Sequence, residues 1–215
     1  MSRNSIAQQP PDPSLDWAMF PLSRLRAGTL LWRAARRGRN PWWFCTCGDC
    51  RFDLDPPRGT SYAGTDELSG ILESIGYEWA SGQPITLAFL RMRTLHSSAE
   101  LLTGPLANLA SRKAVGFRIT NELSDMTPYD TPRALARMLD TARKAGQQVF
   151  AGIRFRTRFD TGPTTRGVAL FGDAGLLRGV PTVEQEITDE LVDELTALGL
   201  VIDVPPALSA LTLAP

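Results

Sequence analysis

Histidine, lysine and cysteine are scarce in this chain of 215 residues, which contains one histidine, two lysines and three cysteines. With His96 alone, no histidine-based metal triad can form, and any Ser-His-Asp or Cys-His machinery must include this one residue. No G-x-S-x-G elbow accompanies it. We therefore interpret His96 as a structural or surface histidine.

Phosphate-binding loops and long apolar runs are also absent. The sequence has no G-x-G-x-x-G after a strand and no G-x-x-x-x-G-K-[ST], so arginines and stacking aromatics would have to hold any nucleotide. No apolar run approaches the ~20 residues of a membrane span, and the polar, proline-rich start lacks an apolar signal core. We expect a cytoplasmic protein with no membrane partner.

Charge is balanced overall and uneven along the chain. The net charge is zero, so bulk attraction to nucleic acid is not expected. Residues 24–58 hold eight arginines and three acids, whereas residues 184–203 hold seven acids and no base. This asymmetry is typical of a positive ligand cleft or of a partner surface, and equally of two differently solvated faces. A coding bias is the first explanation for the abundance of arginine, and it is compatible with phosphate binding, which the arginine side chain suits.

The three cysteines form the most conspicuous cluster, Cys45, Cys47 and Cys50 in "CTCGDC". A C-x-C-x-x-C triplet followed by a distant histidine has the ligand types of a zinc site, but no second ligand pair follows. An odd number of cysteines also argues against a disulfide framework. We interpret these residues as reduced loop thiols and predict no metal site.

Helix and strand patterns alternate irregularly. Apolar runs predict strands over 29–35, 84–95, 148–156, 167–172 and 200–204. Cap residues and apolar stripes predict helices over 65–76, 131–146 and 182–199. Because no regular βαβ alternation appears, we predict an α+β fold, a single compact domain with a mixed sheet and flanking helices. Residues 1–15 are expected to be a disordered lead-in, residues 16–215 the domain, and residues 205–215 have no clear assignment.

Glu73 is the carboxylate whose position decides between two interpretations. On the helical wheel it falls among Asp66, Ser69 and Gly70, away from the apolar stripe of Leu68, Ile71, Leu72 and Ile75. Periodicity alone therefore predicts a solvated surface glutamate.

Several ordered motifs change that interpretation. "LLWRAA" is similar to an opening "LYRV"-type strand, and "NPWWF....GDCRFDLDPPRGTSYAGT" to a W-W-F, G-R-F-D and P-x-G-x-x-Y string. "LSGILESIG", "GIRFRTRFD" and "GVALFG" follow in the matching order. Over about residues 29–172 the chain thus resembles the RES domain family, NAD-consuming toxins of bacterial toxin–antitoxin pairs with an ADP-ribosyltransferase-like fold.

The resemblance implies a set of site residues. It assigns catalytic roles to Arg33, Arg51, Tyr62, Glu73 and Thr157, and NAD binding to Arg33, Arg51, Tyr62 and Trp32. Two positions depart from the family pattern. Thr157 stands where the family has its serine, and Trp32 stands where relatives usually have a tyrosine, which preserves an aromatic face.

The implied activity is cleavage of the nicotinamide–ribose bond of NAD by phosphorolysis or hydrolysis, or ADP-ribosyl transfer. NAD would be the substrate, inorganic phosphate a candidate co-substrate, and no metal would be needed. A small helical antitoxin of the Xre or MbcA kind is the expected partner. Two alternatives stay open: a catalytically degenerate RES domain acting as a protein-interaction module, and a zinc-dependent or nucleic-acid-binding protein built on "CTCGDC" and the arginine-rich segment.

Overall fold

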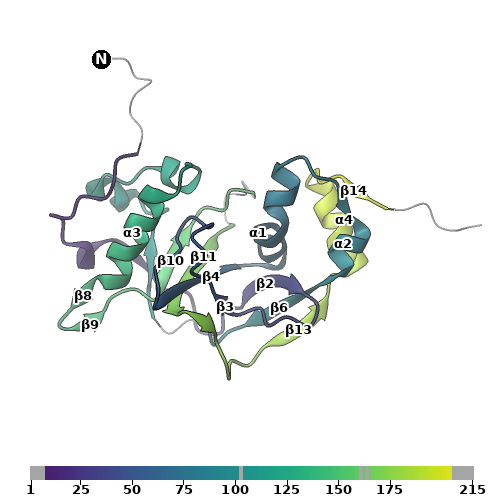
Figure 1. The fold of residues 1–215 in the computed structure, drawn as a ribbon, viewed down its shortest axis with the longest axis horizontal. Helices are drawn as coiled ribbons and strands as arrows, with labels where there is room; N and C mark the ends of the chain where they lie inside the picture. Colours follow the sequence, from purple (N-terminus) through teal and green to yellow (C-terminus); the bar gives the residue numbers. More distant parts are fainter. Residues whose placement is uncertain (1–7, 102–103, 160–161, 163–164, 205–215) are drawn as a thin grey trace, which may run out of the picture.

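A computed structural model describes residues 8–101, 104–159, 162 and 165–204. Its centre is an eight-stranded sheet in the order β1-β7-β10-β11-β4-β2-β6-β13 (Figure 1). Neighbouring strands are antiparallel except β7 and β10, which are parallel. The domain is therefore α+β with a mixed sheet, as the sequence predicted. The strands of this sheet are β1 (Leu22–Ser23), β2 (Leu31–Arg36), β4 (Arg58–Gly64), β6 (Arg93–Ser98), β7 (Leu106–Asn108), β10 (Gly152–Phe155), β11 (Gly167–Asp173) and β13 (Val183–Glu186).

Shorter elements complete the described chain. Three two-stranded pairs join β3 (Trp43–Phe44) to β12 (Gly175–Leu176), β5 (Ile85–Thr86) to β14 (Ile202–Asp203), and β8 (Arg143–Lys144) to β9 (Gln147–Gln148). The α-helices are α1 (Glu67–Ala80), α2 (Leu87–Arg91), α3 (Asp130–Thr141) and α4 (Asp189–Ala197), and the 3-10 helices are η2 (Trp17–Met19), η3 (Arg112–Phe117) and η4 (Asn121–Ser124). No helix among these residues is long and apolar enough to cross a membrane.

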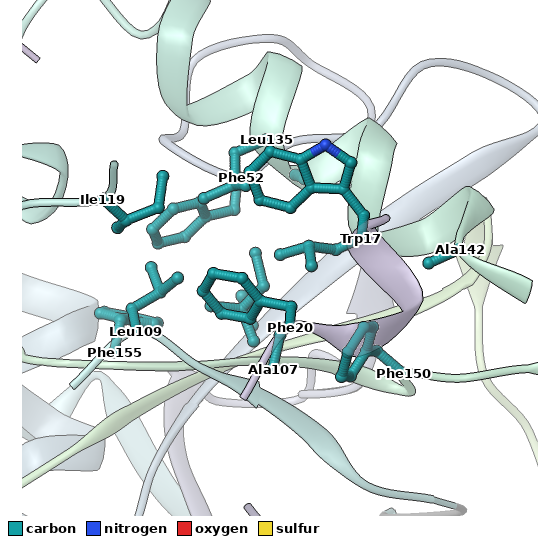
Figure 2. Close-up of a cluster of buried hydrophobic side chains, with 14 of the residues drawn as sticks. Trp17, Phe20, Phe52, Ala107, Leu109, Ile119, Leu135, Ala142, Phe150 and Phe155 are labelled. Carbon is teal, nitrogen blue, oxygen red and sulfur yellow. The ribbon is translucent and has the colours of Figure 1, made fainter. Parts of the chain in front are cut away.

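The helices cover the sheet in two groups. Helix α3 lies at one end, α2 and α4 lie at the other, and α1 lies between them (Figure 1). The larger apolar cluster packs α3 against β10 and the segment of η2, with Trp17, Phe20, Phe52 and Phe155 among its members (Figure 2). A second cluster joins α1 and α4 to β2 and β6. Burial of these two apolar faces fixes both groups of helices against the sheet.

The sheet is weakly joined between β2 and β4. Strand β4 pairs with β11 through seven residue pairs, and β2 pairs with β6 through six. Between β2 and β4 only Trp32 and Gly64 are paired. The two strands therefore splay apart beyond that pair, which leaves room for side chains and ligand where ladder hydrogen bonds would otherwise lie.

The structure corrects several sequence-based boundaries. Residues 84–95, predicted as one strand, form β5, helix α2 and the start of β6. The helix predicted over 131–146 ends at Thr141, where the β8–β9 hairpin begins. Residues 183–186 are strand β13, and Thr188, not Thr182, caps the acidic helix. Helix α1 does not stop at Gly76 but continues to Ala80.

The predicted lead-in is corrected in part, because its second half has a defined path. Gln8 is buried, its backbone N–H donates to Glu122 at 2.8 Å, and its side chain donates to the Arg118 carbonyl at 3.0 Å. Residues 1–7 and the tail 205–215 lie outside the described residues. Gln8 thus already packs against the fold, within the segment that the sequence predicted to be disordered.

Candidate functional site

A cavity of about 300 Å³ opens where β2 and β4 splay apart, beneath the second half of α1. Four arginines and a single glutamate are among its lining residues, so the cavity is strongly positive. Its full lining is Arg33, Ala34, Ala35, Arg36, Cys50, Arg51, Tyr62, Glu73, Ser74, Tyr77, Arg93 and Phe159. The cavity thus contains four of the six residues predicted for the site.

Small residues bring the polar face of α1 onto the sheet. A Cβ added to Gly70 would lie 2.8 Å from the backbone of Trp32, so only glycine allows this approach. One turn later, the Ser74 hydroxyl donates to the Ala34 carbonyl at 2.8 Å. The helix begins with a capping box between Asp66 and Ser69. This polar face is therefore a contact surface and not a solvated one.

Glu73 lies on this face and points into the cavity. Its Oε1 is fully buried and has no hydrogen-bond partner among the described residues. Burial raises the pKa of the Glu73 carboxyl, and the charges of Arg51 and Arg158 act in the opposite direction. The surface position that periodicity predicted for Glu73 is wrong. A helical wheel sorts residues by polarity alone, and it does not show that the small residues Gly70 and Ser74 let this polar face pack against the sheet.

Two arginines approach the cavity from different elements. Arg33, on β2, donates to the Ser61 hydroxyl at 2.8 Å, and burial lowers the pKa of its guanidinium, which nevertheless stays charged. Arg51 is only 6% exposed, donates to the Ser124 carbonyl, and lies 5.2 Å from the ring centre of Phe155. Neither forms an ion pair within the described part of the chain. Their positive charge is thus available to an anionic ligand.

Tyr62 presents its ring to the cavity, while its hydroxyl is engaged behind the wall. The oxygen accepts from the Phe52 N–H at 2.8 Å and donates to Asp53 Oδ1 at 3.2 Å. Burial, followed by the negative charge of Asp53, raises the pKa of Tyr62 well above its ordinary value. The phenol therefore stays protonated and fixes the loop that carries Arg51.

Replacing Tyr62 by phenylalanine is expected to destabilise the fold. The buried Phe52 N–H and the Asp53 carboxylate each lose a partner, which costs about 1–3 kcal/mol. The midpoint of thermal unfolding should fall by roughly 2–4 °C for each kcal/mol. The matched control is Tyr77→Phe, which loses a hydrogen bond to Tyr129 at an exposed position and should change stability by less than about 0.5 kcal/mol. Equal midpoints for the two variants would contradict this role.

Two predicted site residues are not among the cavity lining. Trp32, predicted to stack on a ligand, packs against the apolar cluster shared by α1 and β2. Thr157 is buried on the segment after β10, two residues before Phe159. The structure therefore brings together Arg33, Arg51, Tyr62 and Glu73, and leaves these two outside.

The sequence did not predict Arg158, Tyr77 or Phe159, of which Tyr77 and Phe159 line the cavity. Arg158 donates to the Asp125 carbonyl at 2.7 Å and to the Tyr129 hydroxyl at 3.3 Å, and its charge acts on Glu73. Tyr77 bonds to Tyr129 and meets Phe159 edge-on, with ring centres 5.8 Å apart. One sequence feature could have predicted that the polar face of α1 packs against the sheet, namely the small residues at 69, 70 and 74 on that face.

Cys50 lies in the cavity wall. Burial, together with the nearby charge of Asp53, raises the pKa of its thiol to about 12. At neutral pH the thiol is therefore protonated. The group suited to chemistry is Glu73, a carboxylate that can stabilise a developing cation, with Arg33 and Arg51 placed to bind anionic oxygen.

Fold and site together define a single α+β domain with a positive cavity built around one buried carboxylate. The fold is similar to that of a chain in the MbcT–MbcA toxin–antitoxin complex of M. tuberculosis, with a TM-score of 0.52 and 13% sequence identity, over 78% of this chain and 88% of that chain. No family model and no curated protein matches the sequence. At this identity the likeness shows the fold.

Proposed function

We propose that this protein is a RES-type enzyme that cleaves the nicotinamide–ribose bond of NAD and acts as the toxin of a toxin–antitoxin pair. One observation carries the proposal. Among the described residues, Glu73 Oε1 is buried without a hydrogen-bond partner, in a cavity whose other charged lining residues are arginines. A buried, unpaired carboxylate destabilises a fold, which is the usual cost of a group kept for catalysis.

The charge and size of the cavity suit one end of a dinucleotide. Arg33 and Arg51 can bind pyrophosphate or attacking phosphate through charge-assisted bonds, for which a guanidinium is well shaped. A volume of about 300 Å³ is at the small end of ligand pockets. We therefore propose that it holds nicotinamide and its ribose, with the adenosine extending past Arg36 and Arg93.

The reaction requires stabilisation of a sugar cation more than proton transfer. When the bond between ribose C1′ and the nicotinamide nitrogen breaks, its electron pair neutralises the positively charged ring. The ribose then develops oxocarbenium character, which ionised Glu73 stabilises. An oxygen of phosphate, water or a protein forms the new bond to C1′, and any released proton passes to solvent. No metal enters these steps.

The toxin assignment rests on the motif resemblance and on the fold shared with a chain of a toxin–antitoxin complex. We propose a small helical antitoxin as the partner that restrains the enzyme. Either the acidic helix α4 or the arginine-rich segment 24–58 offers a charged docking surface.

The test is a product analysis of purified protein incubated with NAD, with and without inorganic phosphate. We expect nicotinamide release in both arms if water serves as acceptor, and release only with phosphate if phosphate does. Mass analysis separates ADP-ribose, its phosphate ester and ADP-ribosylated protein. A folded chain that releases no nicotinamide in either arm would contradict the enzyme and favour the interaction module, for which the position of Thr157 outside the cavity lining is the supporting observation.

A further inference from the structure

A second cluster of reactive side chains lies behind the cavity wall, in the loop between β3 and β4. All three cysteines of the chain fall within residues 45–50. The sulfur atoms of Cys45 and Cys47 and a carboxylate oxygen of Asp53 all lie within 4.8 Å of one another. Spacing alone offered no fourth ligand, but the fold supplies Asp53, three residues after Cys50.

The loop holds these atoms in place through its own backbone. The Cys47 N–H donates to Cys45 Sγ at 3.2 Å. The Gly48 and Cys50 N–H groups both donate to Asp53 Oδ2 at 3.1 Å. Gly48 has a φ of +75°, a conformation that favours glycine. The sequence of the loop itself therefore allows the chain to turn sharply between Cys47 and Cys50. The ligand atoms of Cys45, Cys47 and Asp53 are therefore close together before any ion binds, whereas Cys50 Sγ is not part of this group.

The cluster has the charge and chemistry of a site for a soft cation. Asp53 is 2% exposed and forms no ion pair within the described residues. A bound cation would offset the negative charge of Asp53 and favour the thiolate form of its cysteine ligands. Sulfur ligands with one carboxylate oxygen match the preferences of zinc in tetrahedral sites.

We propose that Cys45, Cys47 and Asp53 bind one Zn²⁺ ion as a structural site, with Cys50 of the same loop as the fourth ligand once the ion is bound. Each coordinating thiol gives its proton to solvent and donates a sulfur lone pair to the metal. The Cys47 thiol donates a hydrogen bond to Asp53 Oδ2 at 3.4 Å. On metal binding this hydrogen bond would be lost, and both groups would coordinate the ion instead. This proposal differs from the sequence-based interpretation of the three cysteines as reduced loop thiols without a metal.

The ion would stiffen the wall of the cavity and take no part in bond cleavage. Asp53 uses one oxygen for the cluster and the other for the Tyr62 hydroxyl. Cys50 lines the cavity, and Arg51 follows it in the chain. The site does not depend on the proposed NAD chemistry and stands or falls separately.

The experiment titrates the full-length, reduced, metal-free chain with Co²⁺ and then with Zn²⁺. We expect one ion per chain, a thiolate-to-cobalt charge-transfer absorption, and its loss when Zn²⁺ displaces Co²⁺. Cys47→Ser, at an exposed position, should weaken Zn²⁺ affinity by at least about 10–100-fold in competition with a chromophoric chelator. Asp49→Asn, in the same loop and outside the cluster, should bind like the parent.

Two outcomes would overturn the proposal. One is a parent chain that binds Co²⁺ without a thiolate charge-transfer band, or with less than one ion per chain at saturation. The other is a Cys47→Ser chain with parental Zn²⁺ affinity. Neither result depends on NAD turnover, so an inactive chain with a normal cobalt spectrum would contradict only the proposed function.

Discussion

Glu73→Gln is expected to lower kcat for NAD cleavage by about 10²–10³-fold with little change in KM. Glutamine keeps the size and shape of the side chain but carries no charge, so the oxocarbenium-like transition state loses its stabilising partner. The intact substrate carries no such cation on its ribose, so binding is affected less. The effect should therefore appear in kcat.

The same substitution is expected to leave the fold as stable or to stabilise it. Burial raises the pKa of Glu73, so the folded state disfavours the ionised form. A carboxyl with a raised folded-state pKa favours folding at low pH, and that contribution is lost as pH rises through the folded pKa. At neutral pH the neutral glutamine avoids this loss. Activity and stability should thus move in opposite directions.

Thermal unfolding at pH 7 and steady-state kinetics measure both effects on one preparation. Glu194→Gln on the exposed face of α4 is the matched control and should leave kcat, KM and the unfolding midpoint unchanged. A lowered midpoint for Glu73→Gln would mean that the carboxylate is a structural partner. Unchanged kcat would remove Glu73 from the reaction.

The sequence predicted the fold class because several elements carry their own boundary signals. Strand β2 coincides with a short apolar run, and α1 begins at acidic and hydroxyl residues. The predicted bounds of β11 differ from the observed ones by one residue. The errors fall where tertiary contacts override local pattern. Residues 87–91 become helix α2, capped by Thr86, within a stretch that alternates like a strand. Residues 183–186 pair with β6 as the last strand of the sheet.

Four of the six residues that the sequence predicted for the site line one cavity, Trp32 and Thr157 do not, and the geometry of the cavity was not predictable. Motif order placed Arg33, Arg51, Tyr62 and Glu73 together, and all four line one cavity. Nothing in a one-dimensional pattern shows that β2 and β4 pair at a single point. Nor does it show that Arg158 hydrogen-bonds to Tyr129, because the two residues come from segments that only the fold brings together.

Arg51→Met is expected to move the acidic limb of the pH–rate profile to higher pH. Protonation inactivates Glu73, so the rate falls as pH drops through the pKa of this carboxyl. Arg51 is the first of the two cations that lower that pKa, against the raising effect of burial. Methionine fills a similar volume without charge, so the pKa should rise further and the carboxylate should need a higher pH to ionise.

The position of this limb distinguishes two roles for Arg51. Loss of the hydrogen bond to the Ser124 carbonyl should also lower the free energy of unfolding by about 1–3 kcal/mol. A smaller folded fraction lowers the maximal rate, but it does not change the pH at which the rate is half-maximal. If Arg51 only binds the pyrophosphate, KM should rise while the limb of kcat stays in place. Arg112→Met, at an exposed position on η3, provides the control for removal of one positive charge. A limb that moves for Arg51→Met and stays in place for Arg112→Met would identify Arg51 as one of the cations that favour ionised Glu73.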